Sequence, residues 1–189
     1  MDSNRVEMRF AGSGGQGVIL ASVIIAEAAV IAGLNAVQSQ AYGPEARGGV
    51  SKAETIISRD KIWYSKVTRP GFLLALTQAS ADKYAEELTE DAVVMLDESL
   101  QIPAGLDPAR VIVVPVLRTA KEKVGKAFTA NIVAVGAINA ALRLFPGEAL
   151  LEGVRRHIPA GTEEINQLAL AEGAALITDA QAAAFEQRI

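Results

Sequence analysis

A glycine-rich segment near the start of the chain is the part of the sequence best suited to chemistry. Residues 10–25 read FAGSGGQGVILASVII, in which Gly12, Gly14 and Gly17 satisfy the pattern G-x-G-x-x-G between two apolar runs. In that setting glycines let the backbone approach a phosphate, and the first free N–H groups of the following helix attract its charge. The pattern predicts a phosphate-bearing nucleotide ligand. The competing interpretation is a tight strand-to-helix turn that binds nothing.

The residues that follow this turn argue against a nicotinamide dinucleotide. Such a site needs an Asp or Glu about 20 residues beyond the turn, at the end of the second strand, to hold the ribose hydroxyls. Residues 36–42 read AVQSQAY there, and the first acidic residue is Glu45 in the next loop. Gln38, Ser39 and Gln40 offer hydrogen bonds but no carboxylate. Coenzyme A, which carries phosphates but has different ribose chemistry, is therefore the better fit.

Other side chains that could do chemistry have simpler interpretations. His157, the only histidine, follows two arginines near a helix end, where a contact with the helix dipole is expected in place of catalysis. Asn131 begins an apolar helix and could cap it. Three lysines could neutralise a 3′-phosphate, although a basic run on a short helix is more often a solvated face: Lys121, Lys123 and Lys126. No nucleophile–base pair or metal-ligand cluster stands out, so we predict no catalytic residue in this chain.

The composition fits a single globular domain over residues 1–189. Half of the residues are hydrophobic, which is enough for a sizeable buried core. The net charge of −4 argues against nucleic acid as a partner. Cysteine is absent, which removes disulfides, thiolate nucleophiles and cysteine-ligated iron–sulfur clusters. The first residues lack an apolar signal region and the run 18–32 is too short to span a bilayer, so we expect a cytoplasmic protein.

Short apolar runs alternate with helical patterns, which indicates an α/β fold with a mostly parallel sheet. Strands are expected over 8–11, 36–39, 50–58, 72–76, 92–96 and 111–114. Helices are expected over 18–32, where Gly33 ends the helix, and over 79–88. The C-terminal third reads as helices over 131–144, 148–158, 162–172 and 180–188.

Three local patterns add detail to this outline. Arg59 and Asp60 separate the β-branched run 50–58 from 61–64, which predicts an antiparallel hairpin. Thr119 and Glu122 fit a capping box, which predicts that a short helix begins there. Residues 41–49, AYGPEARGG, contain a proline and three glycines and are expected to form a loop long enough to carry function.

Three motifs together give the chain a family resemblance. GSGGQG (12–17), QSQAYGPEARGG (38–49) and NIVAVGA (131–137) resemble, in order and spacing, the γ subunit of 2-oxoacid:ferredoxin oxidoreductases. Those enzymes oxidise pyruvate, 2-oxoglutarate or branched 2-oxoacids to acyl-coenzyme A and reduce ferredoxin. The likeness runs from the first strand to about residue 172.

The resemblance implies a three-layer α/β/α domain with a mixed sheet, a Rossmann-like glycine-rich first turn, and a role in coenzyme A binding and assembly of the complex. It places thiamine diphosphate between partner α and β subunits and iron–sulfur clusters in cysteine-bearing subunits, one of them ferredoxin-like. It makes the glycine loop the expected cofactor-binding segment: Gly12, Ser13, Gly14, Gly15, Gln16 and Gly17. It also puts the loop around Arg47 at the interface and at the rim of the coenzyme site, where a planar, permanently charged guanidinium suits phosphate recognition.

The alternatives lie in three classes. The small subunit of an indolepyruvate:ferredoxin oxidoreductase belongs to the same superfamily. A stand-alone Rossmann dehydrogenase is disfavoured by the missing ribose acid and by the lack of a residue suited to hydride transfer. An assembly module whose glycine loop no longer binds anything would show no effect of loop mutations on coenzyme A.

Overall fold

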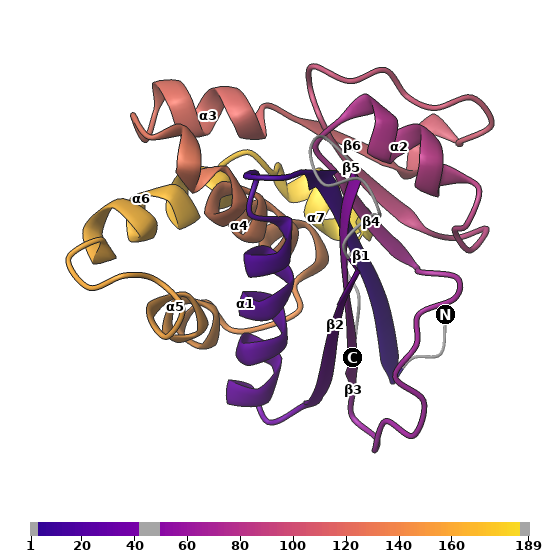
Figure 1. Cartoon of the computed structure of the whole chain (residues 1–189), viewed down its shortest axis with the longest axis horizontal. Helices are drawn as coiled ribbons and strands as arrows, with labels where there is room; N and C mark the ends of the chain where they lie inside the picture. Colours follow the sequence, from indigo (N-terminus) through magenta and orange to yellow (C-terminus); the bar gives the residue numbers. More distant parts are fainter. Residues whose placement is uncertain (1–3, 42–49, 186–189) are drawn as a thin grey trace.

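A mixed sheet with strand order β2-β3-β1-β4-β5-β6 forms the centre of the fold (Figure 1). The computed structural model describes residues 4–41 and 50–185. Its strands are β1 (Arg5–Ser13), β2 (Asn35–Ala41), β3 (Val50–Ser58), β4 (Phe72–Ala75), β5 (Val93–Asp97) and β6 (Val111–Val114). Every strand predicted from an apolar run is present, with its ends shifted by three residues at most. The predicted α/β class with a mostly parallel sheet is confirmed.

Strand β3 is the one antiparallel strand of the described sheet, and it lies between β2 and β1. Val50 pairs with Ser13 at one end of β1, and Ser58 pairs with Arg5 at the other. The opposite edge of β3 pairs with β2 from Lys52 to Ser58. The predicted hairpin between 50–58 and 61–64 is therefore wrong, because both edges of β3 are already hydrogen-bonded and a third ladder has no free backbone groups to use.

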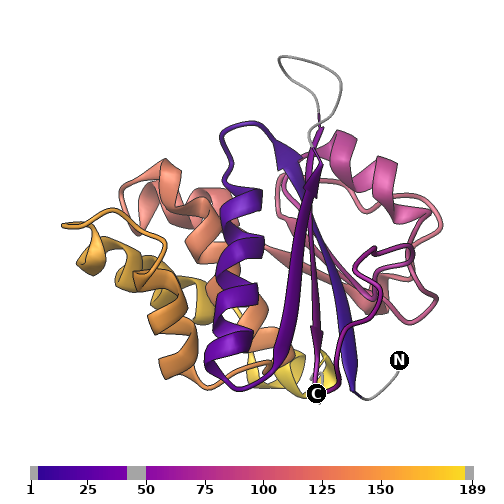
Figure 2. The same ribbon diagram turned by 60° about the horizontal axis from the view of Figure 1, so that its bottom comes forward.

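Helices cover both faces of the sheet, but unequally. The helices are α1 (Val18–Ile31), α2 (Gln78–Ala85), α3 (Val116–Glu122), α4 (Ala130–Leu142), α5 (Gly147–Arg155), α6 (Glu163–Ala174) and α7 (Asp179–Phe185). Figures 1 and 2 show α2 alone on one face, while α1 and α4 lie on the other with α5 and α6 outside them. Short 3₁₀ turns occur at Pro108–Arg110 and Ala127–Thr129. This is the three-layer α/β/α arrangement that the resemblance implied.

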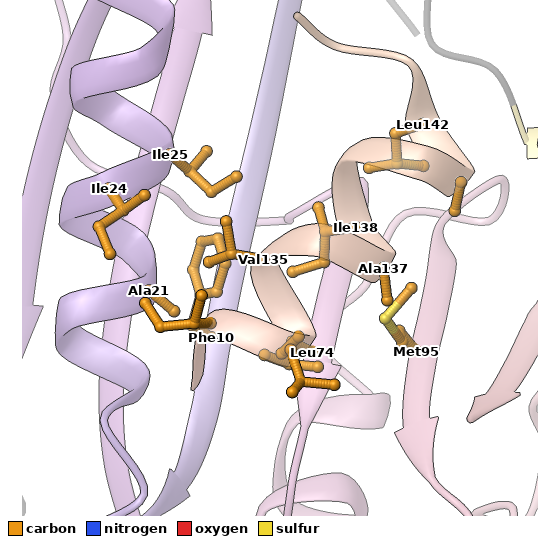
Figure 3. Close-up of a cluster of buried hydrophobic side chains, with 14 of the residues drawn as sticks. Phe10, Ala21, Ile24, Ile25, Leu74, Met95, Val135, Ala137, Ile138 and Leu142 are labelled. Atoms are coloured by element: carbon orange, nitrogen blue, oxygen red, sulfur yellow. The ribbon is translucent and has the colours of Figure 1, made fainter. Parts of the chain in front are cut away.

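The main core lies between the sheet and the α1/α4 layer. Phe10, Leu74 and Met95 reach out from three neighbouring strands and meet Ile24 and Val135 of the two helices (Figure 3). Both helices are apolar on nearly every side because each packs against the sheet and against further helices. Within the described residues no helix is long and apolar enough to cross a membrane.

The opposite face carries a buried charge cluster that fixes α2 to the sheet. Arg9 of β1 is 1% exposed and forms an ion pair of 2.7 Å with Glu54, its direct partner on β3. Its guanidinium also pairs with Glu87 and lies 4.9 Å from the ring centroid of Tyr84. Burial raises the pKa of the Tyr84 hydroxyl. A buried guanidinium must keep its partners, since removing one from such a cluster typically costs about 3–5 kcal/mol.

Two contacts near the helix ends differ from the local sequence patterns. Helix α3 starts at Val116, so Thr119 lies inside it and the predicted capping box is wrong; the buried carboxylate of Asp97 accepts from the Leu117 N–H at 2.9 Å instead. His157 follows α5 and lies 3.6 Å from the carboxylate of Glu27 on α1. The Arg156 guanidinium is hydrogen-bonded to Glu27 and lowers the pKa of that carboxyl. This end of α5 is thus tied to α1 by charge.

Helices α4 and α6 approach so closely that their contact requires glycine on both sides. A Cβ at Gly136 would lie 2.2 Å from the carbonyl oxygen of Leu170, and one at Gly173 would lie 2.0 Å from that of Val133. Such distances lie well inside van der Waals contact, so the helices would have to separate. Gly136 belongs to the motif NIVAVGA, and its place there is explained by helix packing.

We predict that Gly136→Ala destabilises the protein although alanine is the better helix former. Overpacking of this kind should cost about 1–3 kcal/mol, against roughly 1 kcal/mol gained in helix propensity at most. Gly147→Ala is the matched control, because nothing lies within 4 Å of a Cβ there. Urea unfolding of the isolated chain measures both variants, and a Gly136→Ala chain as stable as the control would contradict the packing argument.

Candidate functional site

The glycine-rich segment forms the turn between β1 and α1 at the carboxyl end of the sheet. Strand β1 ends at Ser13, and α1 begins at Val18 after Gly17. Gly15 and Gly17 have φ of +90° and +71°, in the left-handed region that favours glycine. Helix α1 lies on one face of the sheet and α2, which follows the neighbouring strand β4, lies on the other. The turn therefore sits where the chain connections diverge, the usual position of a ligand crevice in such sheets.

The Gln16 side chain holds this turn together from inside. Its carboxamide oxygen accepts from the Ser13 N–H at 2.7 Å, and its nitrogen donates to the carbonyl of Leu76, just beyond β4, at 3.1 Å. A Cβ at Gly12 would lie 2.5 Å from that oxygen. Of the six predicted loop residues, Gly12 and Gln16 thus have an internal structural use that the sequence pattern does not separate from ligand contact.

The outer part of the turn leaves backbone groups open. Gly14 and Gly15 are exposed, and nothing lies within 4 Å of a Cβ built at either position. Within the described chain, the N–H groups of Val18, Ile19 and Leu20 have no acceptor, and no side chain caps the helix. An uncapped helix start with no acidic residue in its first turn favours an anion.

A cavity of about 260 Å³ adjoins these open N–H groups. It is lined by Ser13, Gly14, Gly15, Gly17, Val18, Ile19 and Ser51. The two serines add hydroxyl donors from adjacent strands, since Ser51 of β3 pairs with Gly12 of β1. Ser51 was not among the predicted site residues, because only the antiparallel pairing of β3 brings it to this end of the sheet. The donor set consists of hydroxyls and backbone N–H groups, which suits a phosphate.

Asn131 lies directly behind the turn. It is the second residue of α4, not its cap, and it is 4% exposed. A Cβ at Gly17 would lie 2.7 Å from its side-chain nitrogen, so Gly17 is needed for this contact as well as for its positive φ. The side-chain oxygen of Asn131 is buried and has no hydrogen-bond partner among the described residues. The structure therefore joins the first and third sequence motifs, which are more than 110 residues apart in the chain.

The end of β2 is too far away to serve this site. Because β3 lies between them, β2 is two strand spacings, or about 10 Å, from β1. Gln38 points elsewhere and donates to the Ser22 hydroxyl at 3.0 Å. An NAD site places its ribose carboxylate on the strand beside β1, and here that neighbour is the antiparallel β3. The strand order and the lack of an acidic residue at 38–40 therefore both argue against an NAD site.

The remaining candidates lie away from the turn or outside the described residues. Arg47 and the rest of 42–49 fall outside them. The three lysines predicted to form a solvated face are exposed, and no ion pair of theirs occurs in the described part of the chain: Lys121, Lys123 and Lys126. No group of three His, Asp or Glu residues placed to hold a metal ion occurs within 4–41 and 50–185.

The fold and the turn define a class: a mixed α/β domain whose first strand and first helix are joined by a glycine-rich turn at an uncapped helix start. The family model described as "Pyruvate ferredoxin/flavodoxin oxidoreductase" matches residues 7–176, and the chain belongs to this family. The predicted family resemblance is confirmed.

Individual relatives agree with this assignment over most of the chain. The 2-oxoglutarate synthase subunit KorC of Methanocaldococcus jannaschii is 40% identical over 172 residues, which are 89% of this chain and 92% of the relative. The crystal structure of the keto/oxoacid ferredoxin oxidoreductase γ subunit from Geobacter sulfurreducens is 41% identical with a TM-score of 0.81 and covers 96% of this chain and 98% of that one. An indolepyruvate oxidoreductase subunit IorB from Archaeoglobus fulgidus is 28% identical over 89% of this chain, so the γ-type interpretation is supported over that alternative.

We predict that the two carboxamides at this turn differ in their importance for folding. Gln16→Ala removes both hydrogen bonds and leaves the Ser13 N–H and the Leu76 carbonyl unpaired, which should cost about 1–3 kcal/mol. Asn131→Ala removes a side chain with no hydrogen bond to lose and should cost clearly less. Urea unfolding of the isolated chain measures both, and equal losses would mean that Asn131 makes a bond that its observed surroundings do not contain.

Proposed function

We propose that this chain is a noncatalytic γ subunit of a 2-oxoacid:ferredoxin oxidoreductase complex, and that its glycine turn binds a phosphate of coenzyme A. The single observation that carries the coenzyme proposal is the row of unpaired N–H groups at the start of α1, beside the bare backbone of Gly14 and a phosphate-sized cavity. The names of the relatives, which are subunits of oxidoreductases acting on 2-oxoacids, support the wider assignment.

The proposed division of labour follows from the side chains of the chain. It has no cysteine, so a cysteine-ligated iron–sulfur cluster belongs on another subunit. We propose no catalytic residue in this chain, so thiamine diphosphate and the oxidation of the 2-oxoacid are assigned to partner α and β subunits, with a ferredoxin-like subunit carrying electrons onward. This chain would supply one wall of the site where coenzyme A enters, in the cytoplasm. The KorC relatives make 2-oxoglutarate the first substrate to test.

The residues of the turn have distinct parts in this proposal. The N–H groups of α1 and the hydroxyls of Ser13 and Ser51 donate to the phosphate oxygens. Gly14 lets the phosphate reach the backbone, while Gln16 and Asn131 hold the turn from inside. Arg47 is proposed as a further charged contact at the rim and at the subunit interface.

We predict that Gly14→Val raises the KM for coenzyme A about tenfold, equivalent to about 1.4 kcal/mol, in the assembled enzyme. A branched side chain there blocks close approach to the backbone but meets nothing in the chain itself, so folding should be unaffected. Decarboxylation of the 2-oxoacid without coenzyme A should stay within twofold of wild type. Gly147→Val is the matched control, since its site is equally open and lies on α5. Unchanged coenzyme A kinetics in a folded, assembled variant would make the turn purely structural.

A second prediction concerns Arg47. Charge reversal by Arg47→Glu should weaken assembly with the thiamine-binding subunits by tenfold or more in Kd, while the melting temperature of the isolated chain changes by less than about 2 °C. Sedimentation of the mixed subunits measures the first and calorimetry the second. Normal assembly with full turnover would remove Arg47 from both the interface and the coenzyme site.

A further inference from the structure

The segment 59–69, which joins β3 to β4, displays the most exposed aromatic residue of the described chain. Trp63 is 84% exposed and its neighbour Tyr64 is 61% exposed. Large aromatic side chains lose favourable burial when they are left in water, and two side by side are unusual on a protein without partners. These residues are the ones that were predicted to form the second strand of a hairpin.

The segment is held firmly although it has no ladder. Its Val67 is buried, with 3% exposed, and anchors the part of the segment that leads to β4. The Tyr64 carbonyl accepts from the Arg5 guanidinium at 3.2 Å, and Arg69 donates to the Leu88 carbonyl at 3.2 Å. The two aromatic rings are therefore displayed by a fixed backbone, which reduces the entropy lost when a partner covers them.

The surface around the two rings is basic, in contrast to the rest of the protein. Segment 59–69 contains four basic residues and one acidic residue, whereas the whole chain has a net charge of −4. The Lys61 ammonium lies 4.2 Å from the Trp63 ring centroid, and Lys66 is exposed nearby. Neither lysine has an ion-pair partner in the described part of the chain. Trp, Tyr and Arg are the residues that most often dominate the energy of protein interfaces, and segment 59–69 contains all three.

This surface lies at the opposite end of the sheet from the glycine turn (Figure 1). The Tyr64 carbonyl contacts Arg5 at the start of β1, and the turn follows Ser13 at its end, nine residues or about 27 Å away. A subunit seated at the glycine turn would leave segment 59–69 uncovered unless it also spanned the length of the strand.

We infer that segment 59–69 is a docking surface for a second protein subunit of the complex, one that offers an acidic face with an apolar recess for Trp63. The inference rests on the proposed function for the existence of that complex. The local positive charge selects an acidic partner. A second copy of this chain would bring two basic segments face to face in a symmetric contact. An anionic membrane is disfavoured because it would repel a chain whose net charge is −4.

The single tryptophan of the chain allows a direct test. The chain is produced with 5-fluorotryptophan and assembled with unlabelled partner subunits, so that one ¹⁹F signal reports on Trp63. The change of its chemical shift between H2O and D2O measures exposure to solvent. We expect a large isotope shift in the isolated chain, independent of chain concentration, and a reduction of at least threefold in the complex.

Variants then test how much Trp63 contributes to the free energy of assembly and whether the basic side chains of the segment contribute by their charge. Trp63→Ala should raise the Kd for assembly at least tenfold, and Lys61→Glu with Lys66→Glu should do the same and weaken its dependence on salt. Matched controls outside the segment are Phe128→Ala, at another exposed aromatic residue, and Lys121→Glu with Lys123→Glu, at two other exposed lysines, and they should change the Kd less than threefold. In complexes formed at saturating subunit concentration, Trp63→Ala should leave the KM for coenzyme A unchanged.

The outcomes separate this inference from the proposed function. If the complex forms but Trp63 keeps its full isotope shift and Trp63→Ala assembles like wild type, the docking surface is wrong and the proposed function stands. If the isotope shift of the isolated chain decreases as its concentration is raised, the surface binds a second copy and the proposed partner is wrong. If the shift decreases when phosphatidylserine vesicles are added, the surface binds a membrane and the proposed partner is again wrong. If wild-type chain forms no complex with the partner subunits, the proposed function fails and this inference fails with it.

Discussion

The antiparallel insertion of β3 between β1 and β2 is the constraint on which the rest of the structure depends. It pairs all of β3 with β1 and residues 52–58 of β3 with β2, and its register sets residues from β1 and β3 directly opposite each other. One such pair is the buried Arg9 and Glu54, which are joined at 2.7 Å and together with Glu87 and Tyr84 hold α2 against the sheet. Since a charge buried this deeply must keep its partner, the pair disfavours any slip of β3 along β1.

The same insertion decides what each end of the sheet can do. At the carboxyl end of β1, β3 contributes Ser51 to the cavity at the glycine turn and moves β2 out of reach, so the turn keeps its open backbone but has no neighbour that could hold a dinucleotide ribose. At the amino end, the chain leaves β3 with no edge left to pair, so residues 59–69 run across the surface. The two candidate binding surfaces are thus consequences of one topological choice.

Much of the fold could be predicted because its signals are local. The strands follow short apolar runs, and α1 follows a glycine turn and ends at Ile31, two residues before Gly33, so the periodicity and the turn residues located them without tertiary information. The hairpin and the capping box were predicted wrongly for the same reason: each depends on a partner that is distant in the sequence. The residues 61–64 carry no signal that β3 is already paired on both edges. The residues near Thr119 carry no signal that Asp97, at the end of β5, accepts from the Leu117 N–H at the start of α3. The candidate site divides in the same way: the glycines were visible in the sequence, whereas the internal role of Gln16 and the contribution of Ser51 depend on pairings that only the folded chain makes.

The motif at the start of α4 meets two separate structural requirements, one at the glycine turn and one at the contact with α6. Its first turn must present Asn131 to the glycine turn, where the side chain fits only because Gly17 has no Cβ. Five residues later Gly136 must let the backbone of α6 approach, because a Cβ there would lie 2.2 Å from the Leu170 carbonyl oxygen. The residues between them are apolar because α4 lies between the sheet, α1 and α6 and is buried on nearly every side. The spacing of the motif is therefore set at one end by the site and at the other by the helix layer. A shift of α4 along its axis would change the contact of Asn131 with Gly17 and that of Gly136 with Leu170 together. The α4–α6 contact therefore helps to hold Asn131 in place behind the glycine turn.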